Sequence, residues 1–395
     1  MPGAGLNGID SILIELGADS TRIALLRNGE LIELLVERAG HESRLGWIFL
    51  GRVAEVVKPL NAAFVDIGQT PPAFLSGAAA HWLHPDVSAD TPIGRSVTEG
   101  AAVLVQQVKD AQGDAKGAAV TADISLAGTH LVFTPRRPGI AVSRKIPDKA
   151  ERARLRQTVL DCPLPAQAGL VVRTSAQGAD AAALRAELTG LLARWQGLLD
   201  KAAALQPPAV LDRPPGLLER LLGEIADDCA IRAELTGFTR ARRYAEAHRP
   251  ALLESLSQHR GPTSLFAAEG VEEQIAAALE RRVPLPGGGE LVIDPTEALV
   301  AIDVNSGGRA PREAAFAAVG PVARQICLRA LSGLILADFP RLDARADRAR
   351  LLDALRQAVA GDRVPVQVLG YTNGGLVELI RPRDRDTLAE QLAKG

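Results

Sequence analysis

The sequence has little cysteine and few aromatic side chains, which limits the kinds of site it can hold. Its 395 residues include three cysteines, and aromatic residues make up 3% of the chain. Cys162, Cys229 and Cys327 lie far apart and form no CxxC pair, so neither a zinc site nor a disulfide framework is predicted. We therefore expect three reduced, packed thiols in a cytoplasmic protein.

Long hydrophobic runs and a strong excess of one charge are also absent. No run of about 18 apolar residues occurs, so no membrane span is expected. The N-terminus lacks the basic and apolar segments of a signal peptide. The formal net charge is −2, which does not indicate nucleic-acid binding. It does not exclude such binding, because a local basic surface can bind nucleic acid in a chain that is acidic overall.

The pattern of short apolar runs predicts a β-rich first half. Runs at 11–16 and 21–26, joined by GADS, predict a hairpin, and 31–36 predicts a third strand. Short strands punctuated by proline, asparagine and glycine over 47–77 favour a small β-barrel. The proline-rich stretch 206–216 is predicted to be a linker.

Strands and helices alternate in the last hundred residues or so, which indicates an α/β layer. The expected elements are a helix at 313–330, a strand at 333–338, a helix at 347–360 and a strand at 364–369.

In two stretches of this part of the chain, an apolar run is followed directly by an aspartate. In ALVAIDVNSGGRA (298–310) the run is followed by Asp303, and in SGLILADFPRLD (332–343) it is followed by Asp338. One helix is expected between them, and a right-handed crossover would make the two strands parallel. If the strands are neighbours, both carboxylates lie at the sheet edge where α/β proteins usually bind ligands.

Two close carboxylates repel each other unless a cation sits between them. Oxygen ligands without histidine or cysteine favour Mg²⁺, with Mn²⁺ as an alternative. Such an ion suits phosphodiester or phosphoryl cleavage. Asn305 alternates with Asp303, so it shares a strand face with that carboxylate and could orient a metal-bound water or a phosphate oxygen.

The same residues have two other interpretations, of which the second lacks an essential ligand. Aspartate and asparagine are common in turns at strand ends. A calcium loop is the second alternative, but its twelfth position would be Ala314 in place of the bidentate acid, and the preceding segment is a predicted strand.

Five separated blocks resemble the ribonuclease E/G family in their order and spacing, from about residue 10 to 390. They are GRVAEVVKPLNAAFVDIG, AKGAAVTADISLAG, VIDPTEALVAIDVNSG, GLILADF and GLVELIRPR. The resemblance implies a Mg²⁺-dependent endonuclease of single-stranded RNA. It also implies an α/β composite: a ribonuclease-H-like fold interrupted by an S1 (OB) β-barrel and a 5′-sensor region, followed by a DNase-I-like α/β subdomain.

The domain boundaries implied by the resemblance follow its blocks. They are 1–42 with 209–291 for the ribonuclease-H-like part, 43–122 for the S1 domain, 123–208 for the 5′-sensor region and 292–395 for the DNase-I-like catalytic part.

The resemblance also assigns roles to individual residues. Asp303 and Asp338 would hold the Mg²⁺ and Asn305 would assist at the hydrated ion. Arg173 and Thr174 fall where the family senses a 5′-monophosphate, which suits a guanidinium beside a hydroxyl.

Three further residues match the RNA-binding surface of the S1 domain. Phe64 and Phe74 match aromatics on which a base stacks, and Lys116 matches a basic residue that grips RNA, as in OB barrels that bind single strands. From the sequence alone, a strand phenylalanine is equally well a core residue.

The sequence departs from the family pattern in four places. The cysteine-containing zinc link and the small domain after it are missing, so no zinc is expected and any homo-oligomer would form without a zinc tie. The segment after Gly308 is shortened, GYTNGG lacks a basic residue, and Pro340 alters the loop after Asp338.

The sequence is compatible with three functions. The first is an endoribonuclease acting in ribosomal or transfer RNA processing or messenger RNA decay. The second is an RNA-binding protein of the same fold with weak or lost catalysis. The third is a Mg²⁺ phosphoryl-transfer enzyme acting on small molecules, which no GxxxxGK[ST] motif supports.

Overall fold

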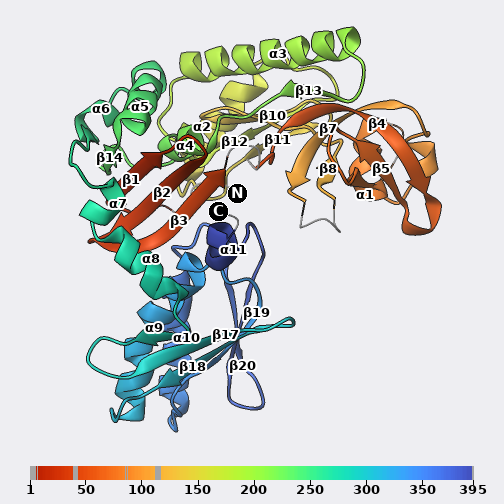
Figure 1. Ribbon diagram of the computed structural model, residues 1–395. Helices are drawn as coiled ribbons and strands as arrows, with labels where there is room; N and C mark the ends of the chain where they lie inside the picture. Colours follow the sequence, from red (N-terminus) through yellow and green to blue (C-terminus); the bar gives the residue numbers. More distant parts are fainter. Residues whose placement is uncertain are drawn as a thin grey trace. The chain divides into compact units, whose positions relative to one another are not determined.

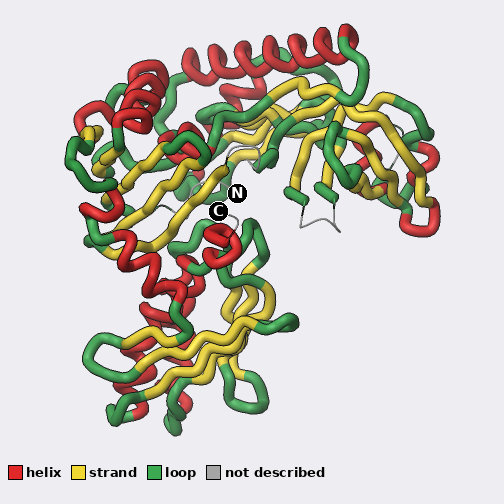
Figure 2. Tube along the Cα trace, in the orientation of Figure 1, coloured by secondary structure: helices red, strands yellow, loops and turns green. Residues whose placement is uncertain are grey.

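The computed structural model describes residues 6, 8–38, 43–84, 86, 88–111 and 117–393. The chain divides into two compact units, the first made of Met1–Glu42 and Gly216–Gly395 and the second of Ser43–Pro215. Figure 1 labels the elements of both units, and Figure 2 distinguishes helices from strands. No helix in the described part of the chain combines the length and apolarity needed to cross a membrane.

The first unit contains a five-stranded mixed sheet that the second unit interrupts in sequence. Its strands are β1 (Ser11–Leu16), β2 (Ser20–Arg27), β3 (Glu30–Arg38), β14 (Ala230–Ala233) and β15 (Leu256–Gln258). Their order in the sheet is β15-β14-β1-β2-β3. β1, β14 and β15 are parallel, whereas β2 and β3 follow β1 as antiparallel neighbours. The strands predicted at 11–16, 21–26 and 31–36 are confirmed.

Helices cover both faces of this sheet, because its strands are apolar on both sides. Ile12 and Ile14 pack with α4, α5 and α6 on one face, and Leu13 packs with α7 and α8 on the other. A Cβ on Gly237 of α5 would lie 2.9 Å from Ile14, so glycine lets this helix approach β1 closely. The covering helices are α4 (Leu217–Leu222), α5 (Leu235–His248), α6 (Leu252–Ser255), α7 (Leu265–Ala268) and α8 (Val271–Leu279).

The first unit also contains a six-stranded sheet formed by the C-terminal part of the chain. Its strands are β16 (Arg282–Pro284), β17 (Glu290–Pro295), β18 (Val300–Asn305), β19 (Gly333–Asp338), β20 (Gln367–Tyr371) and β21 (Val377–Arg381). The order is β16-β17-β18-β19-β21-β20. Only β18 and β19 are paired in parallel among its described strands.

Helices of the described part of the chain cover one face of this second sheet. α9 (Pro311–Leu328) joins β18 to β19, and α10 (Arg345–Val359) follows β19. Ile302 and Val304 of β18 belong to the same buried cluster as side chains of both helices. A fully buried aliphatic side chain contributes about 1.5–3 kcal/mol, so this cluster decides which face of each strand turns inward. On the opposite face Asp303 and Asn305 of β18 are exposed, whereas Val292 of β17, the register partner of Asp303, is buried.

The second unit contains a closed β-barrel. Its strands are β4 (Ile48–Val57), β5 (Ala62–Asp66), β6 (Ala73–Ser76), β7 (Ala102–Lys109) and β8 (Ala119–Thr121). The order is β4-β5-β6-β8-β7, and β7 pairs back to β4 to close the barrel. β6 and β8 are parallel and the other neighbours antiparallel. α1 (Gly77–Ala80) follows β6. The predicted small barrel is confirmed.

A four-stranded sheet and two helices complete the second unit. The elements are β9 (Leu126–Ala127), β10 (Leu131–Thr134), β11 (Gly139–Val142), β12 (Gly169–Val172), α2 (Lys149–Leu160) and α3 (Ala181–Ala204). The strand order is β11-β12-β10-β9. Leucines of α3 pack with Phe133 of β10 and with Leu50 of the barrel in one cluster.

The linker predicted at 206–216 is wrong in part, because its centre is a strand. β13 (Ala209–Asp212) pairs antiparallel with β4 and buries Leu211. The prolines that suggested a linker flank the strand, where no ladder N–H is lost. The strand predicted at 364–369 begins three residues late, at Gln367. The helix predicted at 313–330 corresponds to α9, and the strand at 333–338 is β19.

Buried ion pairs stabilise the C-terminal part of the first unit and link it to the five-stranded sheet. Arg381 of β21 is fully buried and donates from Nε and Nη2 to Asp362 at 2.8 and 3.1 Å. Glu33 of β3, 3% exposed, forms an ion pair with Arg385 just after β21. A buried charge that loses its partner is far costlier than an exposed one.

We expect Asp362→Asn to lower the free energy of unfolding of this unit by about 3 kcal/mol, because the buried Arg381 guanidinium would lose its buried carboxylate partner. It would keep only the more exposed Asp384, 3.3 Å from its Nη1. Urea titration followed by circular dichroism measures the loss. Asp353→Asn is the matched control, since Asp353 is 67% exposed and pairs with Arg356 on the surface of α10. Its expected cost is below about 1 kcal/mol. Equal losses for the two variants would contradict the assignment.

Candidate functional site

Asp303 and Asp338 lie directly opposite each other on neighbouring strands. They are register partners in the parallel pairing of β18 with β19, and both side chains are exposed. Neighbouring strands lie about 4.8 Å apart. Because Ile302 and Ala337 turn toward the helices, the two carboxylates point to the open face of the sheet. The structure therefore brings the two predicted residues together.

Asn305 lies on the same face, two residues beyond Asp303. Its Nδ2 donates a hydrogen bond of 3.1 Å to Asp303 Oδ2. β18 continues through Asn305 because its pairing with β17 extends to Glu290. Asp303 and Asn305 are therefore held inside a paired strand, whereas the sequence suggested that they follow a strand ending at Ile302.

The neighbouring strand β17 also carries carboxylates on this face, and they are paired with arginine. Asp294 accepts two hydrogen bonds from Arg281, at 2.5 and 2.6 Å, and Glu290 pairs with Arg282. The Arg281 guanidinium lowers the pKa of the Asp294 carboxyl, chiefly through these hydrogen bonds. In the described part of the chain, neither Asp303 nor Asp338 forms an ion pair with a basic side chain. Asp303 and Asp338 are therefore carboxylates that could receive a cation, and Glu378 of β21, the register partner of Leu336, lies on the same face.

The oxygen donors at this position fit a hard cation. Two carboxylates and an amide oxygen match the oxygen ligands of Mg²⁺, which needs only one or two carboxylates and keeps several waters. The described residues contain no cluster of three or more histidine, cysteine, aspartate or glutamate side chains that could hold a metal. Closed zinc sites of cysteine and histidine differ from this donor set.

Two glycine-rich turns support the end of β18. Gly289 precedes β17 and Gly307 follows β18, both with positive φ, and a Cβ on either would overlap the backbone of the other turn. Arg309 Nε donates to the Gly287 carbonyl at 2.9 Å. The glycine runs PGGG and SGGR therefore hold Asn305 in place by letting two backbones meet.

Phe64 and Phe74 form a pair on the outer surface of the barrel. They are register partners on β5 and β6, and their ring centroids are 6.1 Å apart in an edge-to-face arrangement. Both are half-buried, whereas Val65 and Leu75 beside them are fully buried in the barrel core. The two rings thus form an aromatic surface outside that core. Lys116, predicted to grip RNA, lies outside the described residues.

Arg173 and Thr174 lie together just after β12. Arg173 Nη1 donates to the Gly128 carbonyl at 2.6 Å, which directs the half-buried guanidinium. The exposed Thr174 hydroxyl is 2.9 Å from the Ser143 hydroxyl. Sequence reasoning did not identify Ser143, and no pattern in the sequence distinguishes it.

Glu187 of α3 is a second residue that sequence reasoning missed. Its carboxylate accepts hydrogen bonds from the backbone N–H of His130 at 2.9 and 3.1 Å and from that of Leu131 at 3.0 Å. Glu187 thereby holds the loop whose Gly128 carbonyl directs Arg173. A signal was present, because Glu187 lies three residues after Leu184 and four before Leu191, on the apolar face of the helix.

Comparison with known proteins gives a consistent set of relatives. The sequence model of the Ribonuclease E/G family matches residues 125–384. Ribonuclease G of Haemophilus influenzae is 33% identical over 400 residues, which span 96% of this chain and 81% of that protein. Ribonuclease G of Escherichia coli is 33% identical over 401 residues, with the same coverage. Ribonuclease E of Escherichia coli is 34% identical over 94% of this chain and 36% of its own length.

We expect Glu187→Ala to destabilise the second unit by about 1–3 kcal/mol, because two backbone donors in the loop lose their acceptor. Hydrogen exchange at the amides of His130 and Leu131 should become faster than in the parent. Arg185→Ala changes an exposed residue of the same helix and should leave both amides unaffected. Unchanged exchange in Glu187→Ala would show that the carboxylate does not hold this loop.

Proposed function

The chain belongs to the ribonuclease E/G family and is an endoribonuclease, and from this premise we propose that it cuts single-stranded RNA in a Mg²⁺-dependent reaction. The observation that carries the proposal is the pairing of Asp303 with Asp338, with Asn305 bonded to Asp303 on the same open face. The likeness to Ribonuclease G extends over 96% of the chain and includes this region. A role in RNA processing or decay accords with these relatives.

We propose that the five-stranded sheet of the first unit is a ribonuclease-H-like fold formed by 1–42 and 209–291. Its order of β3-β2-β1-β14-β15, with parallel pairing only among the last three strands, supports this assignment. The closed barrel supports an S1 (OB) domain at 43–122. The remaining parts are a 5′-sensor region at 123–208 and a DNase-I-like subdomain at 292–395.

The proposed catalytic residues hold the cation and orient its ligands. Asp303 and Asp338 would hold the cation, and Asn305 keeps the Asp303 carboxylate oriented through its amide N–H. When bound, Mg²⁺ supplies an activated water and neutralises charge on the phosphate. Mn²⁺ would satisfy the same donors. Zinc fits less well, because neither a thiolate nor an imidazole belongs to this donor set.

The products follow from which bond breaks. The oxygen of water forms the new bond to phosphorus, and the bond from phosphorus to the ribose O3′ breaks. The phosphate stays on the 5′ side of the downstream fragment. The upstream fragment leaves through its 3′-oxygen, which takes up a proton given up by the attacking water and becomes a 3′-hydroxyl. We therefore expect 5′-phosphate and 3′-hydroxyl ends.

Two surfaces of the second unit would bind the RNA. Phe64 and Phe74 offer aromatic faces on which bases stack without regard to sequence, and Lys116 would add a cation to the same surface. Arg173 and Thr174 would bind a 5′-monophosphate through a guanidinium and a hydroxyl. The exposed Arg144 and Lys145 follow Ser143 and add positive charge beside Thr174.

We expect Asp303→Asn and Asp338→Asn each to reduce Mg²⁺-dependent cleavage by about 100-fold or more, because each removes one of two carboxylates that hold the ion. Cleavage of a short single-stranded 5′-monophosphorylated RNA, with Mg²⁺ or with EDTA, measures the effect. Asp294→Asn removes a carboxylate from the same face that is already paired with Arg281 and should cleave at close to the parent rate.

The same assay separates the two leading functions. Cleavage by the parent that is retained by both variants would overturn the assigned site. RNA binding by the parent with no cleavage in any lane would instead identify an RNA-binding protein that has lost catalysis. A fold check by circular dichroism ensures that a loss of rate reflects the site.

We expect Arg173→Ala to cut 5′-monophosphorylated RNA about tenfold more slowly, because a charge-assisted bond to the phosphate is lost. The rate with 5′-hydroxyl RNA of the same sequence should stay the same. The rate of Arg173→Lys with 5′-monophosphorylated RNA should lie between those of the parent and Arg173→Ala, since lysine keeps the charge but not the planar set of N–H donors. A preference for the 5′-monophosphate that survives in Arg173→Ala would show that another group senses the phosphate.

A further inference from the structure

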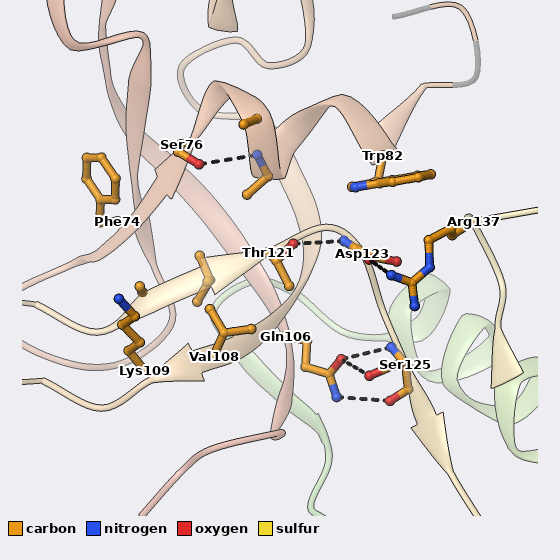
Figure 3. Close-up of a pocket in the computed structure, with 14 residues that line it drawn as sticks. Phe74, Ser76, Trp82, Gln106, Val108, Lys109, Thr121, Asp123, Ser125 and Arg137 are labelled. Atoms are coloured by element: carbon orange, nitrogen blue, oxygen red, sulfur yellow. Dashed lines mark hydrogen bonds and ion pairs between the residues drawn. The ribbon is translucent and has the colours of Figure 1, made fainter. Parts of the chain in front are cut away.

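An open pocket of about 670 Å³ lies on the second unit next to the Phe64–Phe74 surface. Figure 3 shows its walls: Phe74 and Lys109 stand at one end, and Trp82 and Arg137 stand at the other. The Phe74 end belongs to the RNA surface already proposed. The Trp82 end is unassigned, and its chemistry is different.

Trp82 offers an aromatic plane to this end of the pocket. It belongs to the short 3₁₀ segment His81–Leu83 after α1 and is half-buried. The His81 ring packs against it with centroids 4.3 Å apart, and His81 does not line the pocket. One part of the indole is therefore supported by a neighbour while another part faces the pocket. Such a supported aromatic plane is what an unpaired base stacks on.

Asp123 and Arg137 provide an acceptor and a donor beneath the indole. Arg137 Nη1 lies 3.0 Å from Asp123 Oδ2, and the arginine side chain is 44% exposed. The other carboxylate oxygen, Asp123 Oδ1, is buried and accepts no hydrogen bond from the described residues. Burial raises the pKa of the Asp123 carboxyl, while Arg137 and His81 act in the opposite direction. A carboxylate here repels a phosphate, so the chemistry favours a base.

The walls of this pocket are held by hydrogen bonds between the barrel and the neighbouring sheet. Arg136, just before Arg137, donates to the carbonyls of Leu104 and Ala122, both at 3.4 Å. Gln106 of β7 accepts from the Ser125 backbone at 2.8 Å and donates to the Ser125 carbonyl at 3.1 Å. The residues that carry Arg137 and Asp123 are therefore anchored before any ligand arrives.

We propose that the Trp82 end of this pocket binds one unpaired nucleobase of the RNA, stacked on the indole with its polar edge toward Arg137 and Asp123. This inference rests on the proposed function, because it adds a base site to the same RNA path. The Watson–Crick edge of every nucleobase carries both hydrogen-bond donors and acceptors, which suits an adjacent guanidinium and carboxylate. The pocket joins this site to Phe74, so one strand of RNA can contact both.

Binding of a fluorescein-labelled single-stranded RNA to the full chain in EDTA tests the proposal, since cleavage is then prevented. Trp82→Ala should weaken binding by about tenfold, within the range found for the loss of one stacked base. Trp82→Phe should bind within about threefold of the parent, because an aromatic plane remains. Arg137→Ala should also weaken binding, whereas the exposed Arg185→Ala should not.

A second measurement reports on the indole itself. In a Trp47→Phe/Trp195→Phe variant, Trp82 is the one remaining tryptophan of the three in the sequence. A stacked base should quench its fluorescence as RNA is added, and the quenching should saturate with the same affinity as the labelled RNA. This signal remains informative even if Trp82→Ala fails to fold.

The outcomes separate this inference from the proposed function. If Phe74→Ala weakens RNA binding while Trp82→Ala binds as the parent does and Trp82 is not quenched, the base site is wrong and the RNA surface stands. If the parent itself does not bind RNA, both proposals fall. Weakening by both variants, together with quenching of Trp82, supports a base site in addition to the phenylalanine surface.

Discussion

The parallel pairing of β18 with β19 is the constraint on which the candidate active site depends. α9 carries the chain from the end of one strand to the start of the next, and the pairing places Asp303 opposite Asp338. Like charges directly opposite in a sheet are destabilising. The pairing is nevertheless held by the apolar side chains that alternate with these carboxylates and pack on α9 and α10. The helices thus stabilise a strand pair that presents two carboxylates to solvent.

In both units, a core packed against one face of the strands leaves the proposed functional side chains on the opposite face. In the six-stranded sheet, the helices bury Ile302 and Val304 and leave Asp303 and Asn305 exposed. In the barrel, Val65 and Leu75 fill the interior, and Phe64 and Phe74 stay outside. Asp303, Asn305, Phe64 and Phe74, which carry the proposed function, therefore stand on paired strands, whose backbone hydrogen bonds restrict their movement more than a loop would.

Residues outside the proposed sites hold these side chains in position. Gly289 and Gly307 let two turns meet behind Asn305, and Glu187 holds the loop whose carbonyl directs Arg173. Arg136 anchors the turn that carries Arg137 to the barrel. In each case the supporting group bonds to or packs against backbone, so its effect is on position and not on charge at the site.

Much of the local structure and the pair of carboxylates could be predicted from the sequence. Apolar runs of strand length identified β1 and β19, and helical periodicity identified α9, because these patterns depend on near neighbours in the chain. Asp303 and Asp338 stood out as acids ending apolar runs. Where pairing partners are distant, the same reasoning fails: the prolines beside β13 predict a linker, although its short apolar centre pairs with β4.

By itself, then, the sequence determined the family, most strands and helices, and which acids end apolar runs. Only the tertiary structure decided that Asp303 meets Asp338, that Phe64 and Phe74 lie outside the barrel core, and that Trp82, Asp123 and Arg137 line one pocket. The reason is physical: alternation assigns side chains to opposite faces of a strand but does not say which face is buried. That choice is made when barrel closure and helix packing bring distant segments together.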